Sequence, residues 1–246
     1  MQIIVTMKIK LFLTVLTAVF LAVCAKINDK SIVFNSPDGV NKIQFELKEG
    51  VPFYSVTHAE KSVVNTSKLG FIFKDGDTFN SGFIVVDSKT STFDETWEQV
   101  WGEKHFIQNN YNELVVTLQE NKSTKRKLEI QFRAFNDGVA LRYVFPEQGI
   151  SDSIFIMDEC TEFNLAADGN SWWIPAFRDN RYEYLYEKTK VSEIDTVHTP
   201  YTIQSDNELY LSIHEEKLVE FASMTITQSE VTALKCDLVR WSDGVK

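Results

Sequence analysis

The residues of this chain that could do chemistry are concentrated in one run, from Ser171 to Asp195. This run holds two tryptophans, three tyrosines, two arginines and five acids, and it contains no repeat. Aromatic rings stack on the C–H faces of sugars, and carboxylates and guanidinium groups bind sugar hydroxyls. The same residues are also ordinary material for a packed β-rich surface. The run therefore indicates either a sugar site or a packed surface.

A second unusual segment runs from Phe93 to Glu103 and is followed by Asn109–Glu113. It mixes Trp97 and Trp101 with acids, and tryptophan is costly to expose to water. One interpretation places both rings in the core, with the acids pointing outward. The other interpretation makes the segment part of a functional surface.

Recognisable catalytic motifs are missing from the sequence. It has no glycine-rich phosphate loop, no His-Glu-x-x-His, no Cys-x-x-Cys and no Gly-x-Ser-x-Gly. The four histidines, at 58, 105, 198 and 214, are scattered. Most carboxylates are expected on solvated faces. No residue of this chain is therefore nominated as catalytic.

The elements that must position these residues are strands. Apolar and polar residues alternate with a period of two, which is typical of half-buried strands, over 43–47, 114–118, 128–134, 139–145, 209–213 and 234–238. The turn Asn136-Asp-Gly138 joins two of these runs, so 127–145 is predicted to be a hairpin. Glu215–Ala222 is the best candidate for a helical turn. About sixteen short strands without an internal boundary predict one large antiparallel all-β sandwich, in which 171–186 is a long connection at one end or face.

The first 25 residues have the pattern of a signal peptide. Lys8 and Lys10 precede an apolar run that ends at Val23, and Val23-Cys-Ala25 fits a cleavage site. Cys24 leaves open a lipoprotein alternative, although Val23 is poor in that motif. The mature chain, residues 26–246, would then have no membrane-spanning run, and the expected location is periplasmic or secreted.

Charge and cysteine content narrow the class of protein further. Loss of the two lysines would take the net charge from −10 to −12. An acidic chain without a basic stripe argues against a nucleic-acid partner. Cys160 and Cys236 would be the two cysteines left, which is too few for a disulfide framework. We expect them to be unpaired, because Cys236 lies on an apolar strand face and disulfide geometry is demanding.

Nine short motifs, in order along the chain, carry a resemblance to a known family: Ser36-Pro-Asp-Gly39, Phe93-Asp-Glu-Thr-Trp97, Val100-Trp-Gly-Glu103, Tyr111-Asn-Glu-Leu114, Phe135-Asn-Asp-Gly-Val139, Arg142-Tyr143 with Phe145-Pro146, Trp172-Trp-Ile-Pro175, Asn180-Arg-Tyr-Glu-Tyr184 and Leu211-Ser-Ile-His-Glu215. Together they resemble the amino-terminal domain of glycoside hydrolase family 97, from about Ser36 to the last residue.

The resemblance implies a fold and a role. Family members are bacterial, mostly periplasmic α-glucosidases and α-galactosidases. They begin with a β-super-sandwich of galactose-mutarotase type, continue with a (β/α)₈ catalytic barrel and end in a small β-sandwich. Their calcium site takes one carboxylate from the amino-terminal domain, at a position that resembles Glu183. The expected partners are therefore an oligosaccharide or α-glycoside, calcium and the catalytic barrel.

The sequence departs from the family in its length. The family's catalytic acids and bases lie on the barrel, and the chain stops at Lys246, before any barrel. Three hypotheses follow: the amino-terminal domain of a secreted calcium-dependent α-glycoside hydrolase, a free-standing periplasmic carbohydrate-binding module, or a truncated product without independent function. A sandwich without the rest of the enzyme would expose a sheet edge and apolar surface, so we expect poor stability of the isolated chain.

Overall fold

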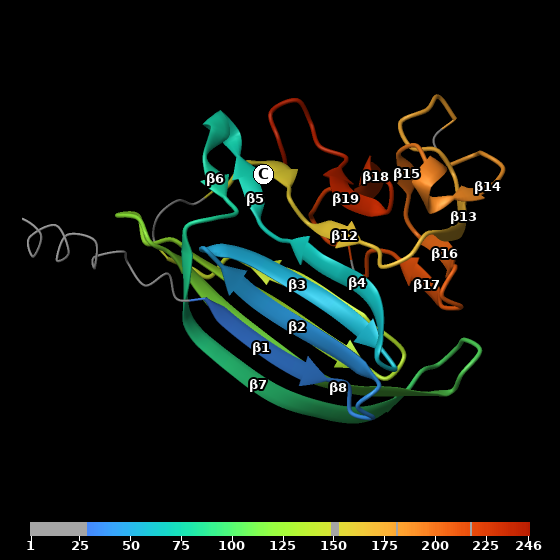
Figure 1. The fold of residues 1–246 in the computed structure, drawn as a ribbon, viewed down its shortest axis with the longest axis horizontal. Helices are drawn as coiled ribbons and strands as arrows, with labels where there is room; N and C mark the ends of the chain where they lie inside the picture. The colour runs from blue at the N-terminus through green and yellow to red at the C-terminus, as the bar shows by residue number, and fades with distance from the viewer. Residues whose placement is uncertain (1–28, 149–152, 181, 217) are drawn as a thin grey trace, which may run out of the picture.

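The fold of the chain is an array of antiparallel sheets, seen in a computed structural model (Figure 1). The structure describes residues 29–148, 153–180, 182–216 and 218–246. Within these ranges the chain forms nineteen strands, grouped in five sheets, and two single-turn 3₁₀ helices. The prediction of an all-β antiparallel sandwich is thus confirmed.

The first half of the chain forms two four-stranded sheets and most of a three-stranded one. The first sheet, in spatial order, contains β1 (Lys30–Asn35), β2 (Asn41–Lys48), β3 (Val51–His58) and β4 (Lys61–Lys68). The second contains β10 (Val139–Val144), β9 (Lys127–Phe135), β8 (Phe106–Glu120) and β7 (Phe83–Glu98). The small sheet contains β11 (Ile156–Glu159), β5 (Phe71–Phe73) and β6 (Thr78–Phe79), with η1 (Lys74–Gly76) between β5 and β6.

The second half adds two further four-stranded sheets. One contains β12 (Glu162–Asn164), β19 (Ala233–Leu238), β18 (Met224–Glu230) and β15 (Val197–His198). The other contains β14 (Glu187–Lys190), β13 (Gly169–Trp173), β16 (Tyr201–Ser205) and β17 (Tyr210–Ile213), and η2 (Val191–Glu193) follows β14.

One part of the core lies between the first two sheets, where the alternation of the sequence explains it, and the same buried cluster continues into the second half through residues such as Trp173, Ile203 and Leu234. Every second residue of β2 and of β9 is buried, so each strand turns one apolar face inward. Phe132 of β9 contacts three rings of the opposite sheet, those of Phe34, Phe45 and Tyr54, at centroid distances of 6.2–6.5 Å. A bridge between Val64 and Leu165 joins this half of the molecule to the second half.

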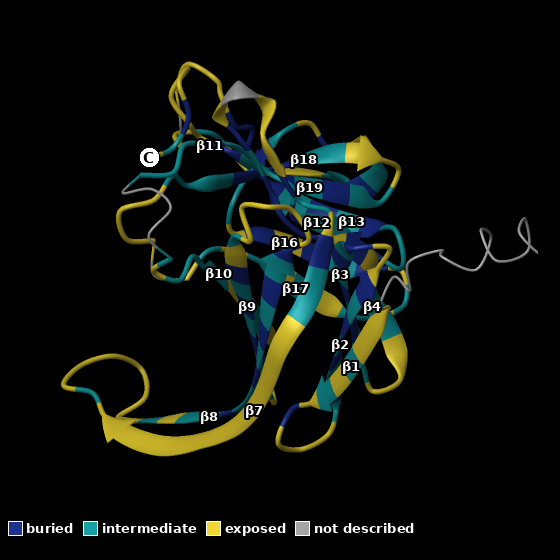
Figure 2. Ribbon diagram, turned by 90° about the vertical axis from the view of Figure 1, so that its left-hand side faces the viewer, coloured by how far each residue is buried: buried dark blue, intermediate teal, exposed yellow. Residues whose placement is uncertain are grey.

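One feature breaks the sandwich. The last residue of β9 pairs with Tyr111, so the far ends of β7 and β8 pair with each other alone and extend beyond the sheets as an arm (Figure 2). β7 is exposed from Val86 to Glu98, which includes its part of the arm. The expected sheet edge, exposed by the lack of the rest of the enzyme, and the poor stability of the chain stay predictions.

The other sequence expectations have mixed outcomes. The hairpin over 127–145 is confirmed by β9 and β10. The helical turn at Glu215–Ala222 is wrong, because the described residues there form irregular backbone. Cys160 and Cys236 are free thiols, as expected. The signal-peptide segment, residues 1–25, lies outside the described residues. None of the described helices is long and apolar enough to cross a membrane.

Candidate functional site

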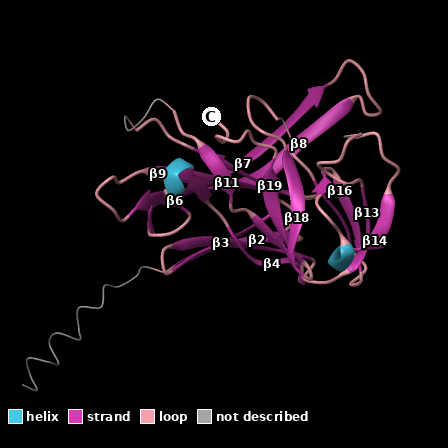
Figure 3. Ribbon diagram, turned by 90° about the horizontal axis from the view of Figure 1, so that it is seen from above, coloured by secondary structure: helices cyan, strands magenta, loops and turns pink. Residues whose placement is uncertain are grey.

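The run singled out in the sequence divides between two strands and the loop that joins them. Ser171–Trp173 end β13 and Glu187 begins β14, and the described residues between them, 174–180 and 182–186, form a loop, called here the aromatic loop. Figure 3 shows this loop at the periphery, beside β13, β14 and β16. The expected long connection is therefore confirmed, although the strands take up its first three residues.

The start of the aromatic loop is fixed by the neighbouring strand β15. Pro175 forms a β-bridge with Val197, and the Ala176 backbone N–H donates to the Thr196 carbonyl over 2.8 Å. Ile174 and Ala176 are buried. The loop then turns outward at Phe177, whose φ of 56° is rare for a bulky residue.

The far side of the loop is held by a ring contact and a turn. Tyr182 stacks on His198 with a centroid distance of 4.1 Å and an interplanar angle of 26°. The Glu183 N–H donates to the Asn180 carbonyl over 3.0 Å, and the Asn180 N–H donates to the Tyr184 hydroxyl over 3.1 Å. These contacts give the loop a defined shape, which a binding surface needs.

The two tryptophans of the run have structural roles. Trp173 is buried, and its indole N–H donates to the Thr189 hydroxyl over 3.0 Å. Trp172 is half-buried, with the Lys188 ammonium 4.9 Å from its ring centroid. The exposed rings of the loop belong to Phe177, Tyr182 and Tyr186. Tyr182 has one face against His198, so its other face is the one open to a ligand.

Glu183 lies exposed on this loop. None of the hydrogen bonds or ion pairs found between described residues involves its carboxylate; Arg178 instead pairs with Asp195 over 3.1 Å. Two other acids of the same run, Glu187 and Glu193, differ from it in their surroundings. Glu187 is exposed at the start of β14, whereas the Glu193 carboxylate accepts the Lys190 backbone N–H over 3.2 Å. Glu183 is thus an available oxygen ligand of the kind that calcium prefers.

The chain alone does not assemble a metal site from its described part. No group of three or more His, Cys, Asp or Glu side chains lies close enough there to hold an ion. Calcium takes six to eight oxygen ligands. A calcium ion at Glu183 would therefore need most of its ligands from another domain, and the exposure of Glu183 fits that arrangement.

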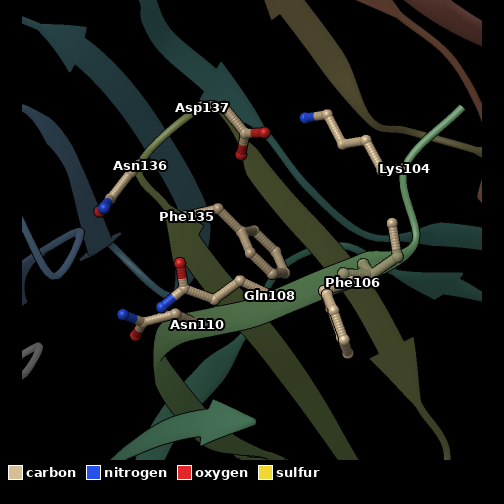
Figure 4. Close-up of a pocket in the computed structure, with 8 residues that line it drawn as sticks. Lys104, Phe106, Gln108, Asn110, Phe135, Asn136 and Asp137 are labelled. Atoms are coloured by element: carbon tan, nitrogen blue, oxygen red, sulfur yellow. The ribbon is translucent and has the colours of Figure 1, made fainter. Parts of the chain in front are cut away.

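The interpretation that placed Trp97 and Trp101 in the core is wrong. Both rings lie on the arm and are 44% and 89% exposed. Within the described residues no second sheet covers the arm, so these rings have no core to pack into. An open hollow of about 400 Å³ lies between the arm and the turn at 135–137 (Figure 4). It is lined by Lys104, Phe106, Ile107, Gln108, Asn110, Phe135, Asn136 and Asp137.

Two of the motifs named in the sequence analysis, residues 36–39 and 135–139, meet beside this hollow, and hydrogen bonds hold the backbone there in place. The Asp38 backbone N–H donates to the Asn136 side-chain oxygen over 3.1 Å. The Asn41 amide donates to the carbonyls of Phe135 and Asn136 over 2.8 and 3.2 Å. Residues 36–39 and 135–139 therefore act here as a structural corner.

Sequence reasoning missed a buried ion pair. Glu120 is fully buried, and the Arg126 guanidinium donates to both of its carboxylate oxygens over 2.6 and 2.8 Å. Burial raises the pKa of this carboxyl, but hydrogen bonds from Arg126 and Thr124 outweigh it and lower the pKa to about 2. The sequence did contain a sign of this burial. Glu120 follows Leu114, Val116 and Leu118 at the same spacing of two residues, which places its side chain on the buried face of the strand.

Comparison with protein families gives a match over most of the chain. The model described as "Glycosyl-hydrolase 97 N-terminal" matches residues 34–244. A retaining alpha-galactosidase of Bacteroides thetaiotaomicron is 21% identical in an alignment of 213 residues that covers 82% of this chain and 31% of that protein.

Solved structures agree with this match. A glycoside hydrolase family 97 enzyme of Pseudoalteromonas sp. strain K8, in complexes with panose and with acarbose, is 35% identical with a TM-score of 0.82. Each alignment covers 87% of this chain and 33% of the enzyme. A beta-arabinopyranosidase shares the fold at 19% identity, with a TM-score of 0.74 over 84% of this chain and 35% of its own.

The chain thus spans about a third of the length of these relatives. Its matched region contains the arm, the structural corner and the aromatic loop. The chain belongs to glycoside hydrolase family 97, and the part of the family that it matches is the amino-terminal domain.

Proposed function

We propose that this chain is the carbohydrate-facing amino-terminal domain of an exported, calcium-dependent α-glycoside hydrolase. In this role it packs on a catalytic barrel and lends Glu183 to a calcium site that the two domains share. The aromatic loop faces the sugar-binding side, and the reaction itself depends on carboxylates of the barrel. The ion would neutralise carboxylates that the two domains bring together.

The observation that carries the proposal is the aromatic loop itself. It is anchored at both ends, yet it exposes an acid and three rings, which is unusual for a surface with no partner. Its tyrosines offer flat apolar faces for sugar rings together with polar tips. The Pseudoalteromonas enzyme of the same family binds panose and acarbose, which supports an oligosaccharide ligand.

Export is part of the proposal. Residues 1–25 would be removed as a signal peptide, which places the domain in the periplasm or outside the cell. The intact mass of the mature protein tests this point. A mature chain that starts at residue 26 supports plain signal-peptide cleavage. A mature chain that starts at a lipid-modified Cys24 would instead show that the protein is anchored to a membrane.

The experiment uses a chimera in which this chain replaces the matched third of the Pseudoalteromonas enzyme. We expect Glu183→Gln to weaken calcium binding about tenfold or more, because one charged ligand is lost. The matched control is Glu187→Gln, an equally exposed acid at the start of β14, which should leave calcium affinity unchanged.

The alternatives give different results in the same assays. A free-standing module would bind oligosaccharides as the isolated chain, with an affinity that calcium does not change. A product without function would bind neither and would fail to restore activity in the chimera. Equal calcium affinity and equal turnover of the Glu183→Gln and wild-type chimeras would remove Glu183 from the site.

A further inference from the structure

The arm is a second surface of this domain that lacks a partner. It comprises residues 94–110, from the pair Asp94–Asn110 outward through the turn that joins β7 to β8. Its two strands hydrogen-bond only to each other, because β9 ends at the Phe135–Tyr111 pair. Figure 2 shows it leaving the sandwich as an exposed ribbon, at the lower left of the view.

Large apolar side chains gather on this arm. Val100 is 97% exposed, Trp101 89%, Phe106 62% and Trp97 44%. An isolated two-stranded hairpin is marginally stable in water, and a cluster of exposed apolar side chains typically marks an interaction site. Tryptophan and phenylalanine are also residues that anchor protein interfaces.

The arm nevertheless has a defined conformation in the chain alone. At its base, Tyr111 stacks on Phe93 at a centroid distance of 5.2 Å and contacts Phe135 at 5.1 Å, and the Arg133 guanidinium lies 4.4 Å from the Tyr111 ring. Near its tip the Gln99 N–H donates to the His105 carbonyl over 2.9 Å. A preorganised arm loses little conformational entropy when it binds.

Charge indicates what the arm binds. Its acids, Asp94, Glu95, Glu98 and Glu103, outnumber Lys104, its one lysine. Two copies of this acidic chain would bring like charges together, which disfavours a dimer through the arm. The occupant that fits has an apolar groove with basic residues at its rim.

We propose that the arm is a docking element that grips the catalytic barrel of a family 97 enzyme, at a place separate from the aromatic loop. This inference rests on the proposed function in one respect, namely that a barrel is the partner. About two thirds of the Pseudoalteromonas chain lies outside the region that this chain matches, so the relatives contain the required surface area.

Hydrogen exchange of the chimera, compared with the isolated full chain, tests the proposal. We expect amides of residues 94–110 to exchange about tenfold or more slowly in the chimera, because docking would cover a hairpin that is open in the chain alone. Trp97→Ser with Trp101→Ser should remove that protection. Tyr210→Ser with Val231→Ser, which changes two residues exposed by 71% and 67% elsewhere, is the matched control.

The outcomes separate the two proposals. Protection of residues 174–186 without protection of the arm overturns the docking arm and leaves the proposed function intact. Protection of the arm alone supports the docking arm and counts against the proposed role of the aromatic loop. Protection of neither overturns both.

A second measurement applies even if the chimera fails to fold. Sedimentation of the isolated chain should show a monomer, as the acidic arm requires. A concentration-dependent dimer that the double serine variant abolishes would assign the arm to a second copy of the chain and overturn the proposal.

Discussion

Glu120→Gln should destabilise the domain more than any exposed charge substitution. The folded structure lowers the pKa of this carboxyl from 4.5 to about 2, because the hydrogen bonds from Arg126 and Thr124 outweigh the cost of burial. Since one pKa unit corresponds to about 1.4 kcal/mol, the ionised form contributes about 3 kcal/mol to folding at neutral pH. Loss of one partner from a buried ion pair costs a similar amount.

The pH dependence follows from the direction of this shift. A carboxyl whose pKa is lower in the folded state contributes its full stability above the unfolded pKa of 4.5. That contribution is lost progressively as the pH falls from 4.5 toward 2. The difference in unfolding free energy between wild type and Glu120→Gln should therefore be largest at neutral pH and should shrink below pH 4.5.

Urea unfolding of the full chain at several pH values measures this difference. Glu113→Gln is the control, because its ion pair with Arg133 is partly exposed and should be worth no more than about 1 kcal/mol. A Glu120→Gln variant as stable as that control at pH 7 would refute the reasoning. So would a difference that stays constant between pH 5 and pH 3.

Three further predictions concern the thiols, the aromatic loop and catalysis. Burial raises the pKa of both thiols, so Cys160 and Cys236 should resist alkylation in the native chain and react in urea; a non-reducing mass two protons lower would show a disulfide instead. Tyr182→Ala removes the stack on His198, so amide exchange in 174–186 should accelerate while the core stays protected, and unchanged exchange would contradict this. The isolated chain should not hydrolyse aryl α-glucosides or α-galactosides with calcium present, because no motif in its sequence supports a pair of catalytic acids; turnover above that of Glu183→Ala would contradict this.

The strands of the sandwich could be predicted because one face of each is buried. The alternation over 43–47 and 128–134 exists because every second residue there is buried. The same alternation, together with the turn at 136–138, predicted the hairpin at 127–145. The expectation for Glu215–Ala222 failed because its large apolar side chains, Leu218, Val219 and Phe221, are exposed, so the described residues there offer no buried face to stabilise a helical turn.

The site could be predicted only in part, because exposure depends on partners distant in sequence. Trp97 and Trp173 are the same residue type in two segments that both allowed a packed or a functional surface, yet Trp173 is buried and Trp97 lies on an uncovered arm. Local sequence could not distinguish them, since burial there is decided by whether another sheet lies opposite. The ion pair between Glu120 and Arg126 was likewise not predicted. The position of Glu120 on the buried face of β8 could have indicated a buried charge.

The most direct test of the central claim is a crystal structure of the chimera with calcium and acarbose. The account predicts a Glu183 carboxylate oxygen about 2.3–2.6 Å from the ion, which is the usual calcium–oxygen distance. The remaining protein ligands should come from the barrel, and the aromatic loop should face the sugar. A calcium ion coordinated without Glu183, with the aromatic loop turned to solvent, would contradict the account.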